Sequence, residues 1–153
     1  ATWSSVATGD FHTCATRSTG RLYCWGADHY GELGNGGTNT ERHAPVLVFG
    51  GVTTWTSVSA GSEHTCARRS TGRLFCWGND FNGGLGDGGT NAERHIPVQV
   101  AGGVTTWASV TGGSYQTCAR RSRGRLYCWG ADSNEELGDG PGNTEQPAPV
   151  RVG

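Results

Sequence analysis

The architecture of this 153-residue chain follows from residues 64–78, which read His-Thr-Cys-Ala-Arg-Arg-Ser-Thr-Gly-Arg-Leu-Phe-Cys-Trp-Gly. Two short runs rich in β-formers flank a Ser-Thr-Gly turn, which is the pattern of a β-hairpin. Closely similar stretches stand 52 residues earlier, at 12–26, and 52 residues later, at 116–130. A stretch that recurs at a fixed spacing is the signature of a repeat architecture.

The period extends to both ends without an insertion. Three tryptophans mark it: Trp3, Trp55 and Trp107. The chain therefore divides into units 1–52, 53–104 and 105–153, with no linker and no separate domain between them. Within a unit the apolar residues alternate with period two. Four short segments of the middle unit, bounded by Gly, Ser or Asn, are predicted strands: 55–58, 64–68, 73–77 and 96–100.

The glycine-rich stretch 83–91 excludes a helix there, because each interior Gly costs about 1 kcal/mol. Four strands in about 50 residues is the size of one propeller blade. We therefore predict an all-β fold, a β-propeller built from three four-stranded blade repeats that form one continuous module.

Each unit carries one Cys-x9-Cys pair. If 18–20 forms a three-residue hairpin loop with Gly20 in the left-handed conformation, counting outward places Cys14 opposite Cys24. Such a non-hydrogen-bonded pair has Cα atoms about 4.5 Å apart, within the range of a disulfide. We predict three structural disulfides: Cys14–Cys24, Cys66–Cys76 and Cys118–Cys128. Free buried thiols are an alternative. Zinc is disfavoured because each unit supplies only two thiols, so we expect no metal and no cofactor.

Composition narrows the function classes. The formal net charge is −1, which argues against a nucleic-acid binder with a basic face. No apolar run reaches the 18 residues of a membrane span. The N-terminus has neither the charge nor the apolar stretch of a signal peptide, so we expect none to remain. Disulfides indicate an oxidising compartment, so we expect a secreted or cell-surface protein.

The recurring motifs Gly-x-x-His-Thr-Cys-Ala, Gly-Arg-Leu-Tyr-Cys-Trp-Gly, Gly-x-Leu-Gly-x-Gly and Pro-Val-x-Val resemble the repeats of the regulator of chromosome condensation family. The resemblance covers the whole chain and implies a β-propeller. The cysteine pair is similar to the secreted bacterial branch of that family. Nothing in the sequence supports the exchange-factor and chromatin roles of the eukaryotic member, whereas a bacterial relative that inhibits β-lactamase shows that the scaffold can bind proteins.

The resemblance also implies roles for individual residues. Three leucines match core positions beneath the long loop: Leu33, Leu85 and Leu137. The third unit departs from the pattern at its outer turn, where Glu135 replaces the glycine of the other units and Pro147 replaces a histidine.

Propellers close with roughly four to eight blades, so three blades leave two open flanks. If the 52-residue pattern continued past Gly153, the next residues would match those that begin at Ala1. We expect self-association into a closed six-bladed dimer, or into a head-to-tail filament where the rotation does not close. The remaining alternative is a piece of a longer propeller or an engineered chain.

The loop after each Trp-Gly differs most between the units, and variable loops on a scaffold carry specificity. The candidate ligand-binding residues form a polar and aromatic rim: Asp28, His29, Tyr30, Asp80, Phe81 and Asp132. The alternative, which we prefer for the aspartates, is that each caps its own turn.

Three further patterns are interpreted as structural. The stretch 87–91 lacks the ligand spacing of a calcium loop and is taken as a turn. The Glu-Arg-His triplets at 41–43 and 93–95 recur and then vanish in the third unit, which favours an ion pair or interface contact over catalysis. The arginines crowding the hairpins of units two and three are either an anion-binding patch or, as we prefer, a charged protected edge.

Together these features predict a non-enzymatic, extracellular binding or scaffold module without cofactors. Its expected partners are a second copy of itself and a protein or carbohydrate ligand. The alternatives are a lectin-like carbohydrate binder, a protein-inhibitor module and the subunit of a structural filament.

Overall fold

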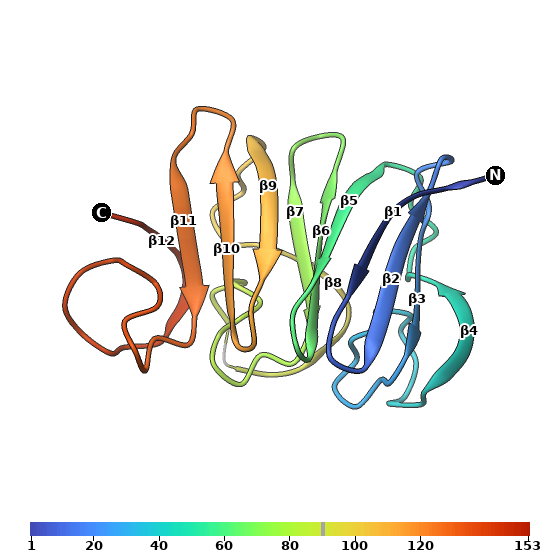
Figure 1. Cartoon of the computed structure of the whole chain (residues 1–153), viewed down its shortest axis with the longest axis horizontal. Helices are drawn as coiled ribbons and strands as arrows, with labels where there is room; N and C mark the ends of the chain where they lie inside the picture. Colours follow the sequence, from blue (N-terminus) through green and yellow to red (C-terminus); the bar gives the residue numbers. More distant parts are fainter. Residues whose placement is uncertain (90) are drawn as a thin grey trace.

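The computed structural model describes residues 1–89 and 91–153, and this part of the chain forms twelve strands and no helix. The strands make three antiparallel sheets of four, which lie side by side in chain order (Figure 1). The first sheet contains β1 (Trp3–Thr8), β2 (His12–Arg17), β3 (Leu22–Gly26) and β4 (Arg42–Leu47). The second contains β5 (Trp55–Ala60), β6 (His64–Arg69), β7 (Leu74–Gly78) and β8 (Arg94–Gln99). The third contains β9 (Trp107–Gly112), β10 (Gln116–Arg121), β11 (Leu126–Gly130) and β12 (Gln146–Arg151).

Strand order within each sheet follows the sequence, so every sheet is a meander and lies within one 52-residue unit. The predicted all-β propeller of four-stranded blades is confirmed. The three blades do not close into a ring. Since the described residues contain no helix, none of them forms an apolar helix that could cross a membrane.

The central hairpin of each blade has the predicted geometry. Gly20 takes φ +75°, and the Arg17 amide donates to the Arg21 carbonyl at 2.8 Å. Cys14 stands opposite Cys24, with Cα atoms 4.1 Å apart and a sulfur–sulfur bond of 2.07 Å. The same pairing joins Cys66 to Cys76 and Cys118 to Cys128, so the predicted disulfide connectivity is confirmed.

The core lies between blades. The disulfide of the first blade packs with Leu33 against two tryptophans of the second blade, Trp55 and Trp77, and all of these side chains are buried. The second blade packs on the third through the equivalent set. The leucines assigned to the core from the family resemblance are indeed buried: Leu33, Leu85 and Leu137. The disulfides of the first and second blades therefore each form one wall of an inter-blade core, which compensates for the small number of aliphatic residues.

One arginine per blade is also part of the scaffold. The guanidinium carbon of Arg69 lies 4.8 Å from the ring centre of Trp55 and 4.1 Å from that of Phe75. Its Nε is buried without a hydrogen-bond partner, as expected for a guanidinium held by cation–π stacking on two rings. Arg17 and Arg121 are held in the same way.

The outer turn of the third blade keeps its shape despite the sequence change. Glu135 has φ +58°, in the left-handed region that Gly31 and Gly83 occupy in the other blades. Its amide donates to the Asp132 carbonyl at 3.2 Å, as the Gly83 amide does to that of Asp80 at 3.0 Å. The substitution places a non-glycine residue in a strained conformation and leaves the turn intact.

The two flanks of the row are open. Trp3 is 47% exposed, whereas its equivalents Trp55 and Trp107 are 3% and 2% exposed. On the opposite flank Leu126 is 42% exposed, whereas Leu22 and Leu74 are fully buried. Each open flank therefore presents one half of an inter-blade core.

Candidate functional site

The blades have two distinct ends. At the hairpin end lie the disulfide hairpins, drawn at the top of Figure 1. At the loop end, drawn at the bottom, the short turns before β2, β6 and β10 lie beside the long loops that follow β3, β7 and β11. The variable loops of all three units therefore share one face.

Charge is sharply divided between these ends. All 13 acidic residues of the chain lie at the loop end, together with two of its twelve basic residues, Arg42 and Arg94. The other ten arginines lie at the hairpin end, so the formal charges of the two ends are −11 and +10, which add to the net −1 of the chain. The net charge of the chain does not reveal this separation. The hairpin end is a basic face although the chain as a whole is nearly neutral.

The three candidate aspartates lie beneath the loop face. Asp28, Asp80 and Asp132 are 2%, 1% and 1% exposed. The Oδ1 atom of each accepts the backbone N–H of the residue five positions later, at 3.0 to 3.1 Å. Burial raises the pKa of Asp28, and it raises that of Asp80 to about 6. Three of the six candidate ligand-binding residues thus cap their own loops, which is the alternative preferred for the aspartates, and they lie beneath the surface.

The aromatic candidates do reach the surface. His29 and Phe81 are exposed, and Phe81 is 67% exposed. The ring centres of Tyr30 and Phe81 are 6.4 Å apart with the planes at 87°, although these residues come from different blades. His29 packs edge-on against Tyr30 at 6.5 Å. The fold therefore brings together the loops of the first and second blades, as a shared rim requires.

This pair borders a pocket of about 320 Å³ whose other lining residues the sequence analysis missed. They are Glu63, Asn79, Asn82 and Tyr115. The sequence held a signal for two of them. One position changes completely between the units, as Phe11, Glu63 and Tyr115, whereas the cysteine three residues later never changes. Since Tyr115 belongs to the third unit, the pocket draws on all three blades.

One hydrogen-bonded pair in this pocket occurs in the middle blade and has no counterpart in the other two. The Asn79 Nδ2 donates to Glu63 Oε2 at 2.7 Å, and the Asn79 Oδ1 accepts the Phe81 amide at 2.7 Å. The other units have Ala27 and Ala131 in place of Asn79, so they cannot hold a carboxylate in this way.

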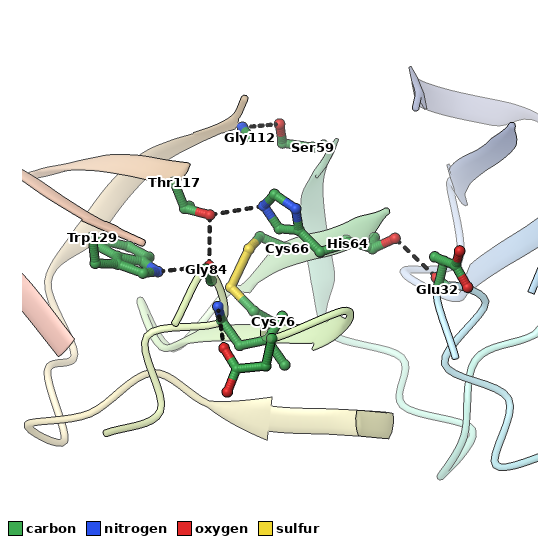
Figure 2. Close-up of a disulfide and its surroundings, with 12 residues drawn as sticks. Glu32, Ser59, His64, Cys66, Cys76, Gly84, Gly112, Thr117 and Trp129 are labelled. Atoms are coloured by element: carbon green, nitrogen blue, oxygen red, sulfur yellow. Dashed lines mark hydrogen bonds between the residues drawn. A yellow bond between two sulfur atoms is a disulfide. The ribbon is translucent and has the colours of Figure 1, made fainter. Parts of the chain in front are cut away.

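Buried histidines at the loop end join the blades. Figure 2 shows His64 facing the Thr117 hydroxyl across a blade junction. The His64 Nε2 lies 2.8 Å from this hydroxyl, which donates to the Gly84 carbonyl at 2.8 Å. The Trp129 indole donates to the same carbonyl. Burial lowers the pKa of His64 to about 4, so this imidazole is neutral at physiological pH and acts as a structural donor.

The repeated triplets also have structural contacts. His95 pairs with Glu93 at 3.0 Å, and Arg94 pairs with Asp87 at 2.9 Å. The His95 carbonyl accepts the Gly36 amide of the first blade at 2.9 Å, which makes this strand part of a blade junction. Within residues 1–89 and 91–153, no group of three or more His, Cys, Asp or Glu side chains is arranged to hold a metal ion.

Comparison with known families agrees with the fold. A model described as the regulator of chromosome condensation (RCC1) repeat matches residues 19–68 and 71–120. A second model of the same description matches 3–32, 55–83 and 107–136.

Known relatives are longer proteins. The chain is 29% identical to the protein pim1 of Schizosaccharomyces pombe over 97% of its length, and 33% identical to the ultraviolet-B receptor UVR8 of Arabidopsis thaliana over 90%. It is 30% identical to the human E3 ubiquitin-protein ligase HERC2 over 88%. The chain spans 31% of pim1, 31% of UVR8 and 3% of HERC2.

Two solved structures share the fold. Yeast RCC1 (Prp20), in its complex with Kap60, superposes with a TM-score of 0.88 at 21% identity, over 99% of this chain and 37% of the other. Human WBSCR16 superposes with a TM-score of 0.86 at 23% identity, over 97% of this chain and 37% of the other.

Proposed function

This chain belongs to the regulator of chromosome condensation (RCC1) repeat family, and on that premise we propose that it is a non-enzymatic, extracellular binding module. In this proposal the partial propeller completes itself with a second copy and binds a ligand at the loop end. The observation that carries the proposal is the match between the two open flanks, which are the two halves of one repeated junction.

The polar part of the junction is regular. The Trp77 indole donates to the Glu32 carbonyl of the preceding blade at 2.9 Å, and Trp129 donates to Gly84 at 2.9 Å. The remaining members of this series are the Trp25 indole on the first blade and the Glu136 carbonyl on the third. A copy docked head to tail in the same register would join that donor to that acceptor.

The apolar part of the junction supports the same docking. Trp3 and Leu126 are each more than two-fifths exposed, whereas their equivalents inside the molecule are buried. Burial of apolar surface is the main force that joins protein surfaces. Two chains would supply six blades, a number within the range of closed propellers. If the rotation between copies did not close, the same contact would produce a filament.

An extracellular location is supported by the disulfides, because such bonds persist in oxidising compartments. A protein ligand is supported by the structural neighbour Prp20p of Saccharomyces cerevisiae, which binds Gsp1p and histones. A lectin-like function is the second candidate, because exposed aromatic rings such as Phe81 are suited to stacking on sugars. A protein-inhibitor module would be one form of a module that binds a protein ligand.

Light scattering after size exclusion tests self-assembly. We expect a species of twice the 16.1 kDa chain mass, or a series of larger multiples, and electron microscopy distinguishes rings from filaments. Leu126→Asp on the open flank should shift the protein to monomer. Ile96→Asp is the matched control, because Ile96 is 40% exposed but lies on the outer strand of the middle blade. A monomer for the unmodified chain at micromolar concentration would overturn the assembly.

A further inference from the structure

We propose that the pocket formed by Tyr30, Phe81, Tyr115 and Glu63 is an aromatic cage for a quaternary ammonium group. This chemistry occurs in the free head group of choline and in the side chain of trimethyllysine. The inference names the ligand class of the loop face, so it rests on the proposed role of that face in binding.

The arrangement of rings supports a compact cation. Tyr30 and Phe81 lie edge to face, with planes at 87° and centres 6.4 Å apart, so the two rings form a corner beside the pocket. Tyr115, 47% exposed, lines the same pocket from the third blade. Cations bind aromatic faces when they lie within about 6 Å of the ring centre. Because a trimethylammonium group is nearly spherical, it can touch several walls of such a corner at once.

The backbone that carries two of these rings is held in place by hydrogen bonds. The Tyr30 amide donates to Glu32 Oε2 at 2.8 Å. The Phe81 amide donates to Asn79 at 2.7 Å, and the Phe81 carbonyl accepts from Asn91 at 2.9 Å. A preorganised site loses little conformational entropy on binding.

The electrostatics favour a positive ligand. Glu63 lies in the pocket wall, and the loop end as a whole carries a formal charge of −11. Neither arginine of this end lines the pocket, and Arg94 is paired with Asp87 at 2.9 Å. A concave surface of one sign concentrates ions of the opposite sign.

The two amide side chains of the pocket are already engaged by carboxylates. Asn79 donates to Glu63 at 2.7 Å, and Asn82 donates to Glu145 at 2.6 Å. The hydroxyls of Tyr30 and Tyr115 remain as hydrogen-bonding groups of the lining, so the preference for a cation rests on the ring faces together with the negative charge.

Titration of the whole chain with choline, followed by NMR, is the direct test. The control ligand is 3,3-dimethylbutan-1-ol, which has the same shape without the charge. We expect choline to shift resonances of the pocket and to bind about tenfold more tightly than the neutral analogue, the size of effect that cation–π contacts provide. A trimethyllysine peptide compared with its unmethylated form distinguishes a peptide source from a free head group.

Variants test the assignment to this pocket. Phe81→Leu keeps the volume and removes the π face, and Glu63→Gln removes the charge; each should weaken choline binding several-fold. Phe11→Ala is the matched control, because Phe11 holds the position equivalent to Glu63 on the first blade and is 69% exposed. Equal affinity for the two ligands, or unchanged affinity in Phe81→Leu, would overturn the cage. If the chain bound a glycan or a protein but not choline, the cage assignment would be wrong while the proposed binding role of the loop end would remain. Self-assembly is tested independently by light scattering.

Discussion

The Thr65 hydroxyl of the second blade lies 2.8 Å from Nε2 of His12 in the first, and both side chains are buried. The hydroxyl donates its own proton to the Glu32 carbonyl at 2.9 Å, so the imidazole must donate to the hydroxyl. Burial lowers the pKa of His12 to about 4, against the partial opposition of Asp10. The contact therefore needs a proton on Nε2, and burial keeps the ring neutral at physiological pH.

These histidines should make the blade junctions sensitive to acid. Their pKa near 4 in the folded chain is below the 6.5 of an unfolded one, so between these values the unfolded state binds more protons. Their contribution is complete above pH 6.5 and falls as pH drops to 4, by an amount on the order of 3 kcal/mol for each histidine. Urea titrations at several pH values should show a shallower dependence for His12→Gln and His64→Gln.

Glutamine is a suitable replacement because Gln116 stands at the same position in the third blade. His43→Gln, at an exposed histidine of the first blade, is the control and should leave the pH dependence unchanged. An unaltered pH profile in the double variant of His12 and His64 would contradict this account.

Asp80 should act in the opposite direction. Its folded pKa of about 6 is above the unfolded value of 3.8, so the free energy of unfolding decreases as pH rises between the two. Asp80→Asn keeps an acceptor for the Leu85 amide and removes the buried charge. We expect it to be at least as stable as the unmodified chain at pH 7.5, whereas Asp80→Ala loses about 1 kcal/mol. Thermal unfolding at pH 7.5 compares them, and equal losses in both variants would refute the interpretation.

The three disulfides should differ in their resistance to reduction. Those of the first and second blades are fully buried under tryptophans of the following blade. Cys118 of the third blade is partly exposed on an open flank. Limited reduction with a thiol, alkylation and mass spectrometry should therefore find Cys118–Cys128 opened first in dilute, monomeric protein. Reduction of another pair first would count against the open flank, and slower opening at high protein concentration would indicate that a second copy covers it.

Tryptophans at equivalent positions should contribute different amounts to the free energy of unfolding. Trp55→Ala leaves a cavity in an inter-blade core and should cost about 3–5 kcal/mol. Trp3→Ala should cost clearly less in the monomer, because the Trp3 side chain is 47% exposed. Denaturant titration at low protein concentration measures both. Equal losses would show that position 3 is already buried under those conditions.

Much of the architecture was readable from short-range pattern. Cys14 and Cys24 are ten residues apart around one glycine turn, so local hairpin geometry is enough to pair them. The 52-residue period then extends that result to every blade. Even the role of Asp80 as a loop cap was the preferred interpretation, because an aspartate side chain bonds its own backbone a few residues away.

The candidate pocket at the loop end could not be obtained in this way. Tyr30, Phe81 and Tyr115 lie on three blades, and they meet only because each blade is packed on the next through its disulfide and tryptophans. Local propensity says nothing about the angle between blades, and that angle sets which loop tips touch. The 52-residue spacing, glycine turns and cysteine pairs were thus sufficient for the blades and their disulfides, whereas the packing between blades determined the shared pocket and the exposed flanks.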